Sequence, residues 1–557
     1  MGQQRSAMPP ARHGHRWPWI AGAAGVLIFA AVAALAFIDP FNGEDEPETP
    51  TYTEAIVGAS FRVNPLFVYQ SDADRDLAEL VFSGLVRLSD DGTPEPSLAE
   101  SWEISADGTT YTFALRSGVT WHNGEPFTAE DVTFTYGLLG NPATQADPDQ
   151  AALWQSVSCS AESEMTVECV LPGPYAPFLS YATIGILPSH ILSEVAPEEM
   201  VNDAFNRAPV GTGPYEMESL NETRAVLLAN PHYYLGAPEI ERLELRFYPD
   251  VSSAAADVVR GEAEGLLVDL TINPQDYQAL QATGEVTPHP ASRPAYTTLY
   301  LNNSEAPLID PFVREAIAHA VDADGIIASL LGGRAVRADS PVPPGTWAYD
   351  ADVQAAAFDI RFARNLLDAA GWVLEEDGVV RSRNNVELRF SLMTDQDPLR
   401  GAIADAIAEQ LAEVGIEATV VRESSGSLVT EFLIPKEYQA AVFGWDPGAD
   451  PDPYPAWHSS QATGEGRNLA AYSNETADLL MEEARQTTDL EERREYYRQF
   501  QALFAEDVPS VTLYYPIYSY FVSSRISDVS PGVLFWTSSR FANVHEWGTQ
   551  GQPVFGQ

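Results

Sequence analysis

The chain has 557 residues, of which 45% are hydrophobic and 10% aromatic; this is enough for packed cores in about three to four domain-sized units and excludes a disordered chain. Its 31 basic and 80 acidic residues give a formal net charge of −49. Such an acidic surface repels phosphate backbones and anionic lipid, which argues against nucleic-acid binding, and it indicates cationic ligands only weakly.

The N-terminus indicates export. Residues 17–38 contain no charged residue, and at ~1.5 Å per residue a helix of this length spans roughly 33 Å, enough for one membrane crossing. Three arginines precede the segment, and acidic residues follow it. The positive-inside rule therefore predicts that residues 1–16 are cytoplasmic and that everything after Asp39 is exported.

We expect residues 17–38 to remain as a transmembrane signal anchor in the cell membrane. The alternative is cleavage, because Ala34-Leu35-Ala36 could be a signal-peptidase site. Residues 39–52 are acidic and rich in proline, so they are predicted to form a tether to the extracytoplasmic part.

The first exported residues predict a strand and a helix. Residues 54–69 are typical of a strand that breaks at Asn64-Pro65. The helix predicted from Asp74 onward carries four apolar residues on one face, which are Leu77, Leu80, Val81 and Leu85.

The stretch from residue 94 to 136 predicts β structure followed by a helix. Tyr111, Phe113 and Leu115 alternate with less apolar residues, which is the pattern of a half-buried strand. Thr128 and Asp131 have the spacing of a capping box, so we expect a helix to begin at this point.

Cys159 and Cys169 flank a polar turn in the exported part. That context favours a disulfide over two free thiols, and two neighbouring antiparallel strands could bring the sulfurs together. A redox-catalytic role is disfavoured for this pair, because it lacks the closer CxxC spacing that such cysteines have.

Residues 211–215, GTGPY, predict a tight turn before a strand, because no lysine or helix start follows that would indicate a phosphate loop. Residues 297–303 predict a strand that leads into a helical stretch with Pro311 at an early position. His319 lies on that stretch without partners at metal-binding spacing. Helices and strands then alternate to residue 421, as in a β/α lobe.

The C-terminal part joins a predicted strand to a loop rich in aspartate, proline and aromatic residues, WDPGADPDPYPAW, from residue 445 to 457. Two predicted helices and a strand that contains Tyr514 and Tyr515 follow.

Four of these stretches, at residues 94–136, 211–234, 297–327 and 442–516, resemble the extracellular solute-binding proteins of family 5, the peptide and nickel class that serves ATP-binding-cassette importers. The resemblance implies an α/β fold of mixed lobes, a class II periplasmic-binding-protein-like clamshell with an extra inserted domain. It assigns the chain as follows: lobe I to 53–86, 206–295 and 521–557, the inserted subdomain to 87–205, and lobe II to 296–520.

The same resemblance implies a monomer that needs no cofactor, captures a solute between its lobes and delivers it to a membrane permease. Peptides are the leading ligand class, followed by nickel chelates, oligosaccharides and other small solutes. Two other classes stay open. One is a membrane-anchored sensor or peptide chaperone, although a cytoplasmic segment of about sixteen residues is short for a signalling domain. The other is a hydrolase, although no carboxylate pair stands out and the nucleophile-elbow motif is absent.

A cavity that desolvates its ligand needs aromatic faces and a few polar groups. The candidate ligand-binding residues are therefore Trp445, Asp446, Asp450, Trp457, Tyr514 and Tyr515. In peptide binders of the family, the aspartate that pairs with the ligand's α-ammonium lies three residues after this tryptophan, where this chain has Gly448. Asp446 or Asp450 could replace it, or the ligand could lack an ammonium.

Some residues of this loop also have a structural interpretation. Trp445 could be a core residue under the loop, and Asp450 and Asp452, which are flanked by prolines, could cap turns. A calcium site is a third interpretation, but the aspartates lack the spacing and the bidentate glutamate of an EF-hand.

Overall fold

The computed structural model describes residues 50–376 and 378–549. From Pro50 onward the chain forms one compact unit. The predicted cytoplasmic segment, signal anchor and most of the tether lie outside the described residues, and no helix within the described ranges is long and apolar enough to cross a membrane.

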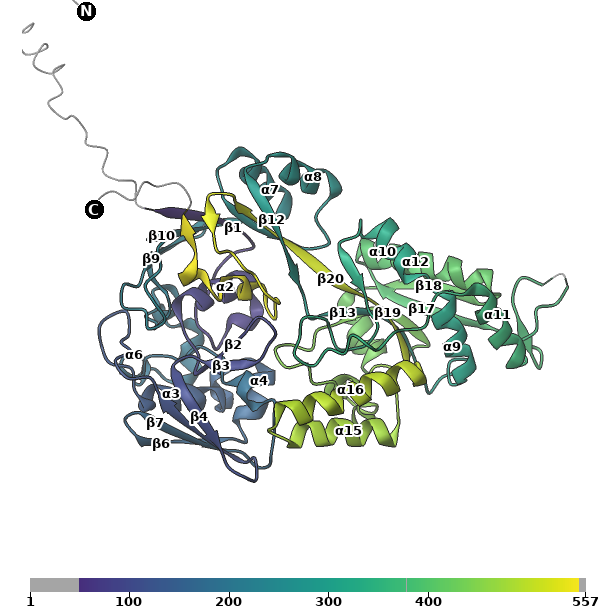
Figure 1. Ribbon diagram of the computed structural model, residues 1–557, viewed down its shortest axis with the longest axis horizontal. Helices are drawn as coiled ribbons and strands as arrows, with labels where there is room; N and C mark the ends of the chain where they lie inside the picture. The colour runs from purple at the N-terminus through teal and green to yellow at the C-terminus, as the bar shows by residue number, and fades with distance from the viewer. Residues whose placement is uncertain (1–49, 377, 550–557) are drawn as a thin grey trace, which may run out of the picture. The chain divides into compact units, whose positions relative to one another are not determined.

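The largest element is a mixed sheet (Figure 1), with the strand order β18-β17-β19-β13-β20-β11-β1-β10-β9-β8, and with β12 and β14 also paired to β20. Its strands are β1 (Thr51–Val57), β8 (Tyr215–Leu220), β9 (Arg224–Ala229), β10 (Arg242–Tyr248), β11 (Gly265–Val268), β12 (Val286–Ser292), β13 (Tyr296–Leu301), β14 (Ala335–Arg337), β17 (Arg389–Asp395), β18 (Glu417–Glu423), β19 (Ala440–Trp445) and β20 (Ser510–Ser523).

The long strand β20 joins the two halves of this sheet. Its first half pairs with β13 and β14, and its second half pairs with β11 and β12. One hydrophobic core lies beside β1, β9 and β10, and another lies beside β13, β17 and β19. Because β20 is continuous through residue 520, the boundary proposed there falls inside a strand; the division into lobes stays a prediction.

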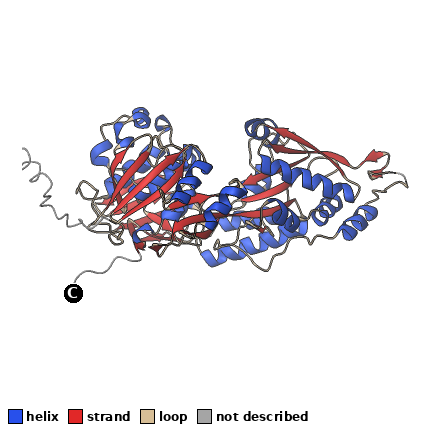
Figure 2. Cartoon of the chain, turned by 90° about the horizontal axis from the view of Figure 1, so that it is seen from above, coloured by secondary structure: helices blue, strands red, loops and turns tan. Residues whose placement is uncertain are grey.

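Helices flank the strands in both halves (Figure 2). They are α2 (Asp72–Val81), α3 (Ala129–Leu139), α4 (Pro148–Trp154), α5 (Phe178–Tyr181), α6 (Ser189–Leu192), α7 (Val251–Arg260), α8 (Pro274–Ala282), α9 (Pro311–Ala320), α10 (Ala323–Leu330), α11 (Ile360–Ala369), α12 (Pro398–Glu413), α13 (Ser425–Ser427), α14 (Tyr454–Trp457), α15 (Glu475–Gln486) and α16 (Leu490–Asp507).

Several predicted boundaries shift. β1 begins at Thr51, inside the range predicted as tether, and ends at Val57, before Asn64-Pro65. The stretch that begins with Pro311 divides into α9 and α10, because the Asp322 side chain accepts a hydrogen bond from the Gly325 N–H and starts a second helix.

Helix α2 ends earlier than predicted. It begins at Asp72 and stops at Val81, and the next residue, Phe82, is extended, so Leu85 is buried outside the helix. The Gly213 N–H donates to the Val81 carbonyl at 2.9 Å. A Cβ on Gly211 would lie 1.8 Å from that carbonyl oxygen, so the GTGPY segment must carry glycine here to close the end of α2.

A separate four-stranded sheet has the order β4 (Ala99–Ile104), β5 (Thr110–Leu115), β7 (Thr166–Val170) and β6 (Ser158–Ser163). The predicted alternation along β5 is confirmed, because Tyr111, Phe113 and Leu115 are buried. Asp131 accepts from the Thr128 N–H at 2.9 Å, as a capping box requires. Its carboxylate also accepts from Ser189, so this cap ties α3 to the segment that begins α6.

The predicted disulfide is confirmed: Cys159 and Cys169 lie opposite each other on β6 and β7 and are bonded. We expect the double variant Cys159→Ala/Cys169→Ala to unfold at lower urea concentration, with a loss of about 2 to 3 kcal/mol, because the bond closes a short loop in the unfolded chain. Reduction of the unaltered protein should give the same shift, and an unchanged midpoint would contradict the prediction.

Candidate functional site

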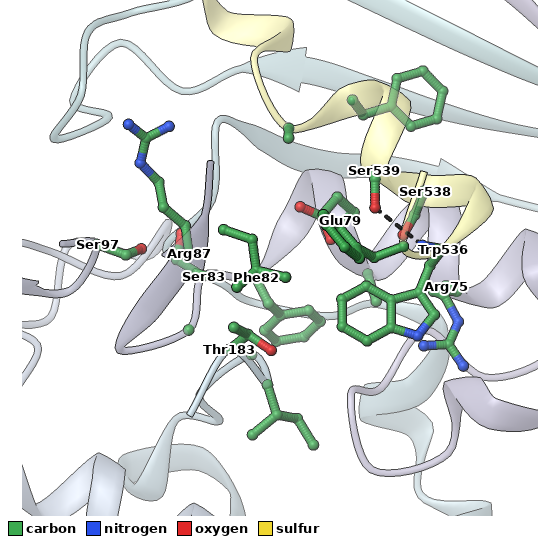
Figure 3. Close-up of a pocket in the computed structure, with 18 of the residues that line it drawn as sticks. Arg75, Glu79, Phe82, Ser83, Arg87, Ser97, Thr183, Trp536, Ser538 and Ser539 are labelled. Carbon is green, nitrogen blue, oxygen red and sulfur yellow. Dashed lines mark hydrogen bonds between the residues drawn. The ribbon is translucent and has the colours of Figure 1, made fainter. Parts of the chain in front are cut away.

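A cavity of about 190 Å³ lies between α2, strand β2 (Val86–Leu88), the loop 183–185 and the segment 531–542 (Figure 3). Its wall mixes charged, hydroxyl and aromatic side chains, among them Arg75, Glu79, Tyr233, Tyr234, Trp536 and Ser538. Aromatic faces with a few polar groups are typical of a small-ligand site.

Glu79 is the acidic side chain of α2 that lines this cavity. Its side chain is accessible from the cavity, yet its carboxylate makes no hydrogen bond or salt bridge with any residue in the described ranges. Enclosure by the surrounding protein raises the pKa of Glu79 to about 7, and the charge of Arg75 opposes this rise.

Arg75 lies one helical turn before Glu79 but does not pair with it. Its guanidinium lies over the ring of Trp536, 5.6 Å from the ring centre. Burial lowers the pKa of Arg75, and the charges that oppose this most are those of Asp72 and Asp147, ahead of Glu79. The cavity therefore holds a basic and an acidic side chain that do not neutralise each other by direct contact.

Arg540 fixes the wall segment 531–542 against α2. Its guanidinium donates two hydrogen bonds to Asp76 at 2.7 and 2.9 Å and one to Glu54 at 3.0 Å, and it also donates to the Thr537 carbonyl. Arg540 is 2% exposed, and both carboxylates are buried. Charge-assisted hydrogen bonds in a site without solvent are strong, so they hold the wall segment firmly against α2.

The three aspartates of the loop predicted as ligand-binding are each paired with an arginine. The pairs are Asp446 with Arg293 (2.6 Å), Asp450 with Arg493 (2.6 and 2.7 Å), and Asp452 with Arg485 (2.7 Å). Asp446 is the exposed member, whereas the side chains of Asp450 and Asp452 are 14% and 7% exposed. The two buried pairs anchor the loop to α16 and α15.

Gly448 belongs to the same loop and has a φ of +79°. Its N–H donates to Asp446 at 2.9 Å. The left-handed conformation favours glycine, so a turn explains why no acidic side chain stands at this position.

Three of the predicted aromatic residues lie inside hydrophobic cores. Trp457 has no exposed surface and donates to the Tyr296 hydroxyl at 3.0 Å. Tyr514 and Tyr515 are each 3% exposed on opposite sides of β20. Trp445, at the end of β19, keeps part of its ring accessible. Contact with a ligand stays a prediction for all of them.

Glu79, Arg75 and Trp536 were not among the residues predicted from the sequence. The four-residue spacing of Arg75 and Glu79 places both on the polar face of α2, and this was the pattern in the sequence that could have indicated them. Trp536 approaches them only because the chain returns to α2 near its C-terminus.

The structure is that of a mixed α/β protein with a cavity beside α2, and the comparisons place the chain in a family. Residues 93–467 match the family described as "Bacterial extracellular solute-binding proteins, family 5 Middle". The chain belongs to this family, whose fold is that of class II periplasmic binding proteins. It is therefore an extracytoplasmic solute-binding component of an ATP-binding-cassette importer.

Relatives and solved structures agree with this assignment. The oligopeptide-binding protein AppA of Bacillus subtilis is 28% identical over 455 residues, which cover 80% of this chain and 82% of AppA. The structure of AppA in complex with a nonapeptide has a TM-score of 0.67 at 26% identity and covers 90% of this chain and 99% of AppA. NikZ of Campylobacter jejuni in complex with Ni(L-His) has a TM-score of 0.69 at 29% identity and covers 90% of this chain and 100% of NikZ.

Proposed function

We propose that the protein binds peptides, works as a monomer tethered to the cell membrane by residues 17–38, and hands its ligand to a membrane permease without chemical change. The observation that carries the proposal is the cavity beside α2, which offers aromatic faces and unpaired polar groups in a protein of this family. AppA, whose structure holds a nonapeptide, supports peptides as the ligand class.

A nickel chelate is the second candidate, because NikZ binds Ni(L-His). The described residues contain no cluster of three or more histidine, cysteine, aspartate or glutamate side chains that could hold a metal ion. A nickel ligand would thus have to arrive already chelated, recognised by its organic part.

A thermal-shift screen of the purified full chain separates these ligands. Di- to hexapeptides are expected to raise the unfolding temperature, because a ligand at 100 times its dissociation constant adds about 2.7 kcal/mol. Oligosaccharides, and nickel with and without histidine, are the comparison arms. A rise with these alone would contradict peptide binding.

Trp445→Ala is expected to weaken peptide binding about tenfold or more, since a partly buried tryptophan that a ligand covers is a frequent hot spot. The unfolding temperature should fall by only a few degrees, because part of the ring is already exposed. Calorimetric titration measures the affinity. The control Trp102→Ala removes another partly buried tryptophan, from the four-stranded sheet, and should leave the affinity unchanged. If both variants bind the peptide with equal affinity, Trp445 does not belong to the site.

A further inference from the structure

Three acidic residues of the predicted ligand loop are already neutralised by arginines, whereas Glu79 in the cavity is not. Asp76, its neighbour on α2, is also paired, through Arg540. The Glu79 side chain is exposed to the cavity, so its ionised carboxylate is accessible to a cationic group of a ligand that enters. Glu79 is thus a carboxylate of the cavity wall that can receive a cation; Asp90 and Asp147 also line the cavity without a salt bridge among the described residues.

The side chains around Glu79 suit a cationic group. The rings of Tyr233 and Tyr234 line the same cavity with their centres 4.7 Å apart. Burial raises the pKa of Tyr233, and the charge of Glu79 adds to this rise. Aromatic faces beside a carboxylate are a common surrounding for ammonium groups. Ser538 also lines the cavity, is 1% exposed, and its hydroxyl has no hydrogen-bond partner among the described residues.

Arg75 is not the cation that pairs with the Glu79 carboxylate. Its guanidinium is held over Trp536, and no salt bridge joins it to Glu79. Arg87, the other arginine of the cavity wall, is paired with Glu95 at 2.7 Å. Both cations therefore have other partners, and they leave the Glu79 carboxylate open.

We propose that this cavity binds a primary ammonium group of the ligand, with the Glu79 carboxylate as its partner and the Ser538 hydroxyl and the Tyr233 ring beside it. This assignment rests on the proposed function, since a peptide supplies such a group at its amino terminus or on a lysine side chain. It moves ammonium recognition away from the loop that contains Gly448, where the aspartates serve as structural anchors.

Binding should depend on pH in a defined direction. The ligand pairs with the ionised carboxylate, so affinity is highest above the pKa of Glu79, about 7, and falls as pH drops below it. Binding should therefore be weaker at pH 5.5 than at pH 7.5, because a smaller fraction of the carboxylates is ionised. The other ionisable groups that line the cavity or border Glu79 are Tyr69, Arg75, Asp76, Arg87, Asp90, Asp147, Tyr233 and Tyr234.

Calorimetric titration of the full chain with three peptides tests the proposal. The peptides are tri-alanine, N-acetyl-tri-alanine, and N-acetyl-Ala-Lys-Ala. In the unaltered protein, acetylation should weaken tri-alanine binding at least tenfold. Glu79→Gln should weaken tri-alanine binding equally, remove its dependence on pH, and make acetylation nearly without effect. Recovery of affinity with the lysine peptide would show that a side-chain ammonium also fits.

Glu409→Gln is the matched control, because it removes one negative charge from the exposed face of α12; it should bind all three peptides like the unaltered protein. If Glu79→Gln still discriminates against the acetylated peptide, the ammonium lies elsewhere and this inference is wrong, while peptide binding stands. If none of the three peptides binds, the proposed ligand class is wrong, and this inference with it.

Discussion

Arg540→Met should lower the free energy of unfolding by about 3 to 5 kcal/mol, because it leaves two buried carboxylates without their cation. Glu54 is fully buried and Asp76 is 3% exposed, and both accept hydrogen bonds from Arg540. The same change should loosen the segment 531–542, which forms one wall of the cavity. Urea denaturation measures the loss.

The pH dependence of this variant distinguishes the lost charge from lost packing. Burial already raises the pKa of Glu54 and Asp76, and Arg540 opposes the rise. Without Arg540 the folded-state pKa values rise further above those of the unfolded chain, so the folded state binds protons more tightly. The variant should therefore be more stable at pH 5 than at pH 7.5.

Arg260→Met removes an arginine from an exposed pair with Asp257 and should change stability by only about 0.5 kcal/mol or less. An Arg540 variant as stable as this control, or one that loses stability as the pH falls from 7.5 to 5, would contradict the account of the buried cluster.

Arg493→Met is expected to cost about 3 kcal/mol or more, because Asp450 then remains buried without its bidentate partner. Arg493 is 4% exposed and also donates to the Tyr497 hydroxyl and the Ala484 carbonyl. Arg498→Met, which alters an exposed pair on the same helix, is the matched control. Denaturant unfolding compares the two variants.

The double variant Asp450→Leu/Arg493→Met decides what Asp450 does. Replacing both members of a buried pair with apolar residues of similar size is often neutral, so stability should largely recover. If Asp450 only anchors the loop, peptide affinity recovers too. Recovery of stability without recovery of affinity would instead make Asp450 a ligand contact.

The sequence predicted what depends on local pattern. The alternation in β5 and the Cys159–Cys169 pairing involve residues close along the chain, and the structure contains both. The end of α2 was misplaced because the residues that close it, Gly211 and Gly213, lie far from it in sequence.

The candidate site was harder to predict for the same reason. The arginines that pair with Asp450 and Asp452 lie on α16 and α15, and no spacing in the sequence indicates those contacts. A run of aspartates beside aromatic residues is typical of a binding loop and also of a loop anchored by ion pairs. Only the fold brings Trp536 to Glu79 and shows which acidic groups line the cavity.

We propose that the protein holds a peptide in its cavity without altering it. The most direct measurement is to incubate the full chain with isotope-labelled tri-alanine, separate bound from free peptide by gel filtration, and analyse the bound fraction by mass spectrometry. We expect about one intact tripeptide to be retained per chain, and we expect this retention to be lost in Glu79→Gln. Recovery of cleaved products, or no retained peptide at a concentration far above that of the protein, would contradict it.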